Sequence, residues 1–174
     1  KLLVNGLMEN LYIEKLIINT MTPLKEGDKA PFFKGLNQNG QEISLDDFKG
    51  KKVILYFYPK DNTSGCTAEA CSLNENYDTL TAKGYEVIGV SPDSVASHQK
   101  FIAKYNLAFN LIADTEKTTL EAYGVWAEKS MYGRKYMGVL RTTFVINEEG
   151  TIIKVITKVN TKAAAEQLLT AMAE

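Results

Sequence analysis

The chain has 174 residues, enough for one domain with a sizeable hydrophobic core. It is 45% hydrophobic and 24% charged, the usual balance of a soluble globular protein, and its formal net charge of -1 gives no electrostatic basis for binding nucleic acid or an anionic membrane. No apolar run approaches the ~20 residues that span a bilayer.

Residues 1–20 differ from the rest of the chain. Their apolar residues are interrupted by Glu9, Glu14 and Lys15, so they lack the continuous apolar region of a secretory signal peptide. We expect an N-terminal extension here, with a short helix or strand packed on the domain as the alternative. A single domain is expected over residues 21–174.

The domain begins with the pattern of a β-hairpin. The turn sequence Asn37-Gln38-Asn39-Gly40 separates two predicted strands, 30–36 and 42–45, because Asn and Gly tolerate positive φ angles. A continuous apolar run at 53–58 then predicts a strand that is buried on both faces, as in a parallel sheet.

The next segment changes from a strand pattern to a helical one. Apolar residues recur at spacings of four, three, four and three from Cys66 to Leu80, which predicts an amphipathic helix that ends near Gly84. Residues 85–90 predict a second strand. Strand, helix and strand in this order form a right-handed βαβ unit.

The second half of the chain continues with short helices and strands. His98, the only histidine, falls in a predicted surface helix, and we expect it to be structural or solvent-facing. The predicted elements are a helix capped within Ser91–Ser94 and carrying Phe101, Ile102 and Tyr105, a strand at 108–113, a helix capped by Asp114-Thr115 and ended by Gly124, strands at 142–146 and 151–156 joined by a tight turn, and a closing helix capped by Thr161.

Cys66 and Cys71 are the only cysteines. Cys66 follows a short turn at the carboxyl end of the 53–58 strand, where ligands bind in open α/β sheets. It also falls in the first turn of the predicted helix, after the N-cap residue types Thr63 and Ser64, and the free N–H groups and dipole at a helix N-terminus favour a thiolate. The pattern predicts an activated nucleophile; the alternative is an inert buried cysteine.

The spacing of the two cysteines restricts how they can react with each other. Five residues along a helix leave two side chains about 140° apart and their Cα atoms roughly 8–9 Å apart. A disulfide needs Cα atoms closer than ~7 Å. Cys66 and Cys71 therefore either never pair or pair only when the first helical turns unwind. In a reducing cytosol, such cysteines are more often catalytic, redox-sensing or metal-binding than structural.

These residues resemble a known family. The pattern Pro59-x-x-x-Thr63-x-x-Cys66 is similar to the peroxiredoxin active-site motif, and the block 56–71 resembles the bacterioferritin comigratory protein, or peroxiredoxin Q, subfamily. A second block within 123–144 is similar to the same subfamily. The resemblance implies an α/β thioredoxin-like fold: a central mixed β-sheet flanked by helices, with an N-terminal β-hairpin.

The resemblance extends from about Thr22 to the C-terminus. It departs at Ser64, where the subfamily usually has proline, and we expect a more flexible turn there without loss of chemistry. The resemblance implies that Cys66 is the peroxidatic thiolate, which becomes a sulfenic acid, and that Cys71 is the resolving thiol. Thr63 would accept the peroxide hydrogen, and Pro59 would shield the sulfur. Arg141 would stabilise the thiolate and the developing charge, and Glu69 would orient Arg141.

The activity implied by the resemblance is that of an atypical 2-Cys peroxiredoxin. It would reduce hydrogen peroxide and organic hydroperoxides and be recycled by thioredoxin or a similar dithiol. The resemblance also suggests a monomer or weak dimer. We further expect a cytoplasmic protein with no cofactor, no metal, and no nucleic-acid or membrane partner. The sequence leaves open whether Trp126 and the 132–136 stretch line the substrate approach or cover the apolar edge of the site.

Three other functions compete with this interpretation. A metallochaperone would normally have cysteines four residues apart and a histidine near a later strand, and a general disulfide oxidoreductase would have Cys-x-x-Cys; neither pattern is present. A non-enzymatic thiol redox sensor or holdase of the same fold remains the alternative, because a reactive thiolate serves both purposes.

Overall fold

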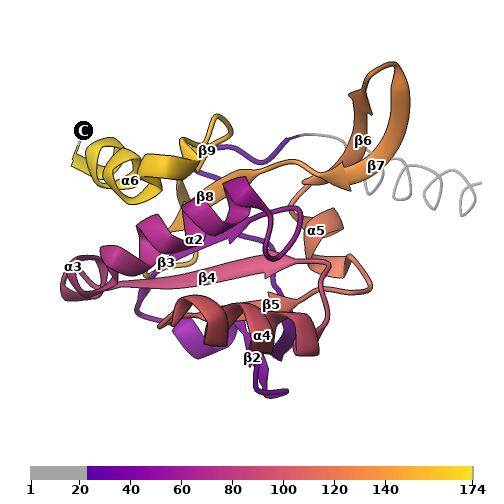
Figure 1. Ribbon diagram of the computed structural model, residues 1–174. Helices are drawn as coiled ribbons and strands as arrows, with labels where there is room; N and C mark the ends of the chain where they lie inside the picture. The colour runs from indigo at the N-terminus through magenta and orange to yellow at the C-terminus, as the bar shows by residue number, and fades with distance from the viewer. Residues whose placement is uncertain (1–22, 174) are drawn as a thin grey trace, which may run out of the picture.

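The structure is a computed structural model that describes residues 23–173. The extension expected for residues 1–20 and the domain start at Met21 lie outside the described residues. A seven-stranded mixed sheet with strand order β2-β1-β5-β4-β3-β8-β9 forms the centre of the molecule (Figure 1). Its strands are β1 (Lys34–Asn37), β2 (Glu42–Ser44), β3 (Lys52–Phe57), β4 (Tyr85–Ser91), β5 (Asn110–Ala113), β8 (Thr142–Ile146) and β9 (Ile152–Ile156).

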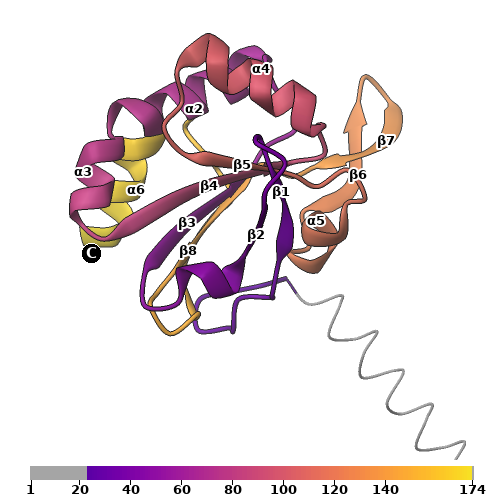
Figure 2. The same ribbon diagram turned by 90° about the horizontal axis from the view of Figure 1, so that it is seen from below.

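The helices lie on both faces of this sheet, unevenly divided. Figure 2 shows the short α5 (Thr118–Ala122) on one face and the longer helices on the other. The helices on this other face are α2 (Ser64–Glu75), α3 (Tyr77–Ala82), α4 (Val95–Tyr105) and α6 (Ala164–Ala173). None of the helices within the described residues is long and apolar enough to cross a membrane.

The central strand β3 contributes side chains to two hydrophobic clusters, one on each face of the sheet. It pairs with β4 in parallel and with β8 antiparallel, so neither of its edges is free. Its side chains alternate between two hydrophobic clusters: Ile54 and Tyr56 pack under α2, α4 and α6, whereas Val53, Leu55 and Phe57 pack on the α5 side. The predicted strand buried on both faces and the predicted mixed α/β fold are both confirmed.

The predicted N-terminal hairpin is also confirmed, with shorter strands. β1 and β2 pair antiparallel, with Gly35 opposite Ile43. Asn37 Oδ1 accepts hydrogen bonds from the amides of Asn39 and Gln41, and Gly40 takes a φ of 73°, so the Asn-Gly turn forms as its sequence requires.

The helix predicted from Cys66 to Leu80 is two helices. α2 ends at Glu75 and α3 begins at Tyr77, with Asn76 between them at a φ of -104° and a ψ of 9°. The Asn76 side chain donates to the carbonyl of Ser72 at 3.0 Å, the kind of local competition that makes Asn unfavourable inside helices. The apolar periodicity is preserved across this break, which is why the sequence pattern does not show it.

Two predicted helix caps are wrong in detail. α5 begins at Thr118, with Lys117 at the N-cap in a left-handed conformation, and Asp114 instead accepts a hydrogen bond from the amide of Leu120 at 2.8 Å. The closing segment starts as a 3-10 turn at Thr161–Ala163, capped at Asn160, before α6 begins at Ala164.

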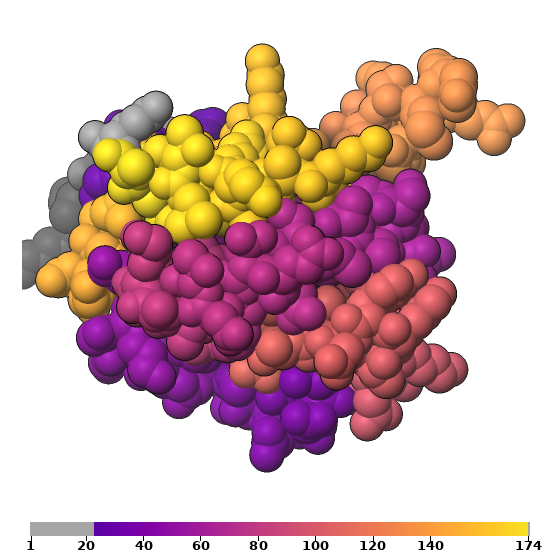
Figure 3. Space-filling view, turned by 60° about the vertical axis from the view of Figure 1, so that its left-hand side comes forward, coloured from indigo at the N-terminus to yellow at the C-terminus, as the bar shows by residue number. Residues whose placement is uncertain are grey.

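A second hairpin was not predicted. Strands β6 (Trp126–Met131) and β7 (Arg134–Val139) pair only with each other and project from the body of the molecule (Figures 1 and 3). Most of its side chains are exposed on both faces, so it lacks the alternation that marks a half-buried strand. Trp126 packs against the core, whereas Tyr132 at the tip is 98% exposed.

Close packing around β4 gives a test of this core. A Cβ atom on Gly89 would lie 2.6 Å from Leu111 Cδ2 and 2.8 Å from the Tyr56 ring. We expect Gly89→Ala to lower the free energy of unfolding by about 1–3 kcal/mol, measured by urea denaturation. Gly138→Ala is the control, because its Cβ would meet only flexible side chains on the exposed hairpin; equal losses from both substitutions would contradict this account of the core.

Candidate active site

The loop after β3 carries Cys66 into the first turn of α2. Asn62 adopts a φ of 58°, which turns the chain, and Thr63 occupies the N-cap position before α2 begins at Ser64. The amide of Thr67 bonds to the Thr63 carbonyl at 2.9 Å. The amides of residues 64–66 precede this bond and form the positive end of the helix, where a thiolate is favoured.

Arg141 contacts this helix although it follows Cys66 by 75 residues in the sequence. β8 runs antiparallel to β3 with Thr142 opposite Phe57, so the residue before β8 lies beside the point where the Cys66 loop leaves the sheet. Arg141 Nη2 donates to Cys66 Sγ at 3.2 Å, and Nη1 donates to Glu69 Oε2. The register of two strands thus delivers a cation to the sulfur.

Gly65, the residue before Cys66, also lies next to this guanidinium. A Cβ atom there would be 3.4 Å from Arg141 Nη2, which is an ordinary van der Waals distance. The first turn of α2 therefore passes close to the guanidinium at the residue that precedes the cysteine.

Glu69 is 1% exposed, and its second oxygen, Oε1, has no hydrogen-bond partner within the described residues. Burial raises the pKa of the Glu69 carboxyl to about 7, although the Arg141 guanidinium acts in the opposite direction. Burial lowers the pKa of Arg141, but Glu69 and the Cys66 sulfur together raise it above its usual value. Arg141 therefore remains a cation beside the sulfur.

Thr63 and Pro59 lie on the loop that leads to the sulfur. The Thr63 hydroxyl donates to the Lys60 carbonyl at 2.8 Å, so its oxygen lone pairs remain free to accept a hydrogen bond. Thr63 is exposed, Pro59 is half-buried and Cys66 is 1% exposed. The hydroxyl three residues before the cysteine is therefore exposed, whereas the sulfur itself is nearly buried.

Cys71 is half-buried in the same helix, and both cysteines are free thiols. Residues 66 and 71 lie within the unbroken α2, so helix geometry keeps their Cα atoms roughly 8–9 Å apart. Burial, and then the carboxylate of Glu75, raises the pKa of the Cys71 thiol. At neutral pH this cysteine is thus held as a thiol.

His98 is fully buried, so of the two expected alternatives, structural or solvent-facing, the solvent-facing one is wrong. Its Nδ1 lies 2.8 Å from Asp61 Oδ2 and its Nε2 lies 3.0 Å from the Ile112 carbonyl oxygen. The sequence contains a signal for this burial: His98 precedes Phe101 by three residues and Tyr105 by seven, which places it on the apolar face of α4. Asp61 was likewise not among the predicted site residues.

Comparisons with known proteins agree with this geometry. The AhpC/TSA family model matches residues 26–155. A Coxiella burnetii protein whose name places it among the Bcp peroxiredoxins is 52% identical over 136 residues, covering 78% of this chain and 90% of that protein. Peroxiredoxin Bcp of Bacillus subtilis is 44% identical over 151 residues, covering 85% and 96%.

Solved structures give the same result. A peroxiredoxin Q variant from Xanthomonas campestris is 35% identical, with a TM-score of 0.76 and coverage of 81% of this chain and 90% of that one. A PrxQ variant from Xylella fastidiosa is 31% identical, with a TM-score of 0.81 and coverage of 88% and 99%.

The contact between Arg141 and Cys66 can be tested by titration. An opposite charge within hydrogen-bond distance typically lowers the pH at which an acid ionises by about 1–3 units. We expect Arg141→Met to move the appearance of the Cys66 thiolate, followed by ultraviolet absorbance in a Cys71→Ser background, to higher pH by that amount. Arg141→Lys, which keeps the charge without the planar fork, should cause a smaller shift. An unchanged titration in Arg141→Met would remove the guanidinium from this role.

Proposed function

Because the chain belongs to the AhpC/TSA family, and within it to the Bcp or peroxiredoxin Q peroxiredoxins, we propose that it is a thiol peroxidase that reduces hydroperoxides through Cys66. The observation that best supports this proposal is the 3.2 Å contact between Arg141 Nη2 and Cys66 Sγ at the start of α2. Helix N-terminus and guanidinium together place positive charge where a thiolate and a developing alkoxide or hydroxide need it.

In the proposed first step, the Cys66 thiolate attacks one oxygen of the hydroperoxide. The sulfur–oxygen bond forms as the O–O bond breaks; the sulfur is oxidised to a sulfenic acid, and the leaving oxygen takes a proton to become water or an alcohol. The free lone pairs of Thr63 accept the peroxide hydrogen and hold the O–O bond in line. Arg141, oriented by Glu69, stabilises the charge on the oxygens, and Pro59 shields the sulfur.

The proposed second step regenerates the enzyme. The Cys71 thiolate attacks the sulfenic acid, water leaves and an intramolecular disulfide forms, which requires the first turns of α2 to unwind. Unwinding also exposes Cys71 to water, which removes the burial that raises its pKa. A dithiol such as thioredoxin then reduces the disulfide and is itself oxidised.

Hydrogen peroxide and organic hydroperoxides are the proposed substrates. One solved relative, the Xanthomonas campestris bacterioferritin comigratory protein, is described in connection with its alkyl peroxide reduction activity. We further propose that the protein acts in the cytoplasm as a monomer or weak dimer. The competing proposal, a redox sensor or holdase, differs in that a sensor would be oxidised once and then stop.

Coupled turnover separates these proposals. With hydrogen peroxide, thioredoxin, thioredoxin reductase and NADPH, we expect wild-type protein to turn over continuously and Cys66→Ser to lose all activity. Cys71→Ser should still consume one equivalent of peroxide at the wild-type rate but should not be recycled by thioredoxin. Continued turnover by Cys66→Ser would contradict the enzymatic proposal, whereas a single oxidation by wild-type protein would favour the sensor.

A further inference from the structure

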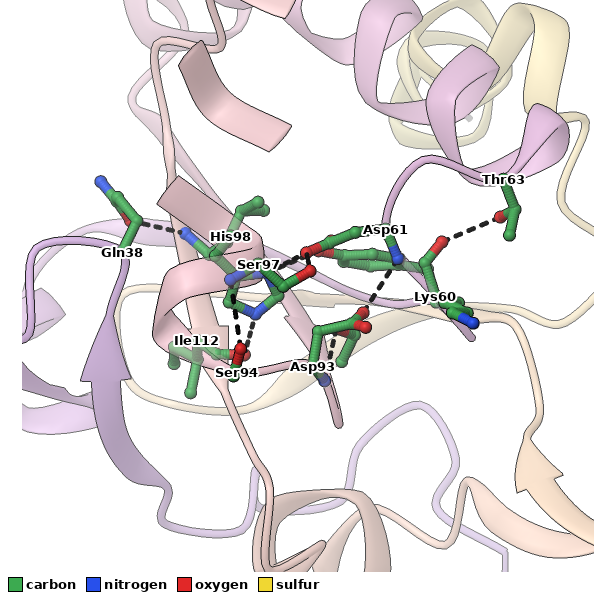
Figure 4. Close-up of polar contacts among 12 residues, drawn as sticks. Gln38, Lys60, Asp61, Thr63, Asp93, Ser94, Ser97, His98 and Ile112 are labelled. Carbon is green, nitrogen blue, oxygen red and sulfur yellow. Dashed lines mark hydrogen bonds and ion pairs between the residues drawn. The ribbon is translucent and has the colours of Figure 1, made fainter. Parts of the chain in front are cut away.

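A buried polar cluster anchors the loop that carries Thr63. Asp61, two residues before Thr63, is 5% exposed and accepts hydrogen bonds from Tyr58 Oη at 2.7 Å and Ser97 Oγ at 2.7 Å, with His98 Nδ1 at 2.8 Å (Figure 4). The Asp61 amide donates to Asp93 Oδ2 at 2.9 Å. The loop is therefore attached to the N-terminal end of α4 through both its side chain and its backbone.

Both ring nitrogens of His98 have a hydrogen-bond partner. Nε2 faces the carbonyl oxygen of Ile112, which can only accept, so Nε2 carries a hydrogen. Burial raises the pKa of Asp61, but the hydrogen bonds and charge of His98 together with Tyr58 and Ser97 lower it below its usual value, so the carboxylate is ionised. Nδ1 lies 2.8 Å from Asp61 Oδ2, so the imidazole ring is held between this carboxylate on one side and the Ile112 carbonyl on the other.

The same side chains are close enough to suggest a metal site, but they are already satisfied. The ligand atoms of Asp61, Asp93 and His98 all lie within 4.8 Å of one another. Asp93 Oδ2, however, accepts from Ser91 Oγ at 2.6 Å and from the Asp61 amide, and His98 Nδ1 is bonded to Asp61. Hydrogen bonds thus account for the facing atoms, and the cluster is better explained as an anchor.

The anchor reaches the proposed substrate position in two steps along the chain. Fixing Asp61 fixes the peptide that joins it to Lys60, whose carbonyl accepts the Thr63 hydroxyl hydrogen (Figure 4). We propose that His98 and Asp61 are positioning residues that hold Thr63 in place to align the peroxide with the Cys66 sulfur. This inference rests on the proposed peroxidase function.

The proposal separates two properties of the site. Positive charge at Cys66 comes from the N-terminus of α2 and from Arg141, the residue before β8, and neither contact involves the hydrogen bonds of His98. Alignment of the peroxide depends on Thr63 and hence on the anchored loop. Loss of the anchor should therefore slow oxidation by peroxide without changing the pH at which the thiolate appears.

Two substitutions of His98 distinguish its two hydrogen bonds. The amide nitrogen of asparagine takes the place of Nδ1, and that of glutamine takes the place of Nε2. In a Cys71→Ser background, we expect His98→Gln to lower the second-order rate constant for oxidation of Cys66 by hydrogen peroxide by about tenfold to a hundredfold, measured by quenched flow and mass spectrometry. His98→Asn, which keeps a donor toward Asp61, should lose less. The thiolate titration should be unchanged in both.

Asn110→Ala is the control for stability. Asn110 accepts hydrogen bonds from Asn37 and Gln38 at the other end of β5, away from the loop, so its loss should destabilise the fold without slowing oxidation. If His98→Gln does not fold, Ser97→Ala removes one donor to Asp61 and should slow oxidation severalfold.

Several results would overturn the proposal. The first is a wild-type rate of oxidation in folded His98→Gln or in Ser97→Ala. The second is an equal loss of rate in His98→Gln and His98→Asn. The third is a slower oxidation that is fully accounted for by a shift of the thiolate titration. Failure of the wild-type chain itself to react with peroxide would instead overturn the proposed function, and this role with it.

Discussion

The rest of the site depends on the two contacts that the Arg141 guanidinium makes, with Cys66 and with Glu69. This guanidinium joins the sulfur of Cys66 to the buried carboxylate of Glu69, three residues further along the same helix. Burial raises the pKa of this carboxyl group to about 7, and the guanidinium beside it acts in the opposite direction, so the cation favours the ionised form of Glu69. The position of Arg141 follows from the pairing of β3 with β8, so the register of the sheet brings this cation to the cysteine, and the N-terminus of α2 adds further positive charge.

The helix that favours the thiolate also keeps the second cysteine out of reach. α2 is 12 residues long and ends where Asn76 interrupts it, so it is held mainly by packing of Ala70 and Leu73 on the sheet. Short helices of this kind open locally at lower free energy than the strands beneath them. The proposed cycle therefore uses one element in two states: folded to activate Cys66, and unwound to let Cys71 react.

Local features of the sequence predicted most of the fold. The apolar run of β3, the Asn-Gly turn and the helical spacing after Cys66 each depend on neighbouring residues and are confirmed. The break at Asn76 and the β6–β7 hairpin were missed, because periodicity continues across the first and is absent from the second. Strand register is non-local, so the proximity of Arg141 to Cys66 was expected only by resemblance, and its role remains a proposal. The burial of His98 was visible in its spacing to Phe101, yet its pairing with Asp61 depends on tertiary packing.

The central claim is that α2, folded when Cys66 reacts with peroxide, must unwind before Cys66 and Cys71 can form a disulfide. Hydrogen–deuterium exchange of the peptide that covers residues 64–75 tests it most directly, comparing reduced protein with protein treated with one equivalent of peroxide. The account predicts strong protection in the reduced form and rapid exchange of these amides after oxidation, with the sheet strands unchanged. Formation of a disulfide between Cys66 and Cys71 with α2 still fully protected would contradict it.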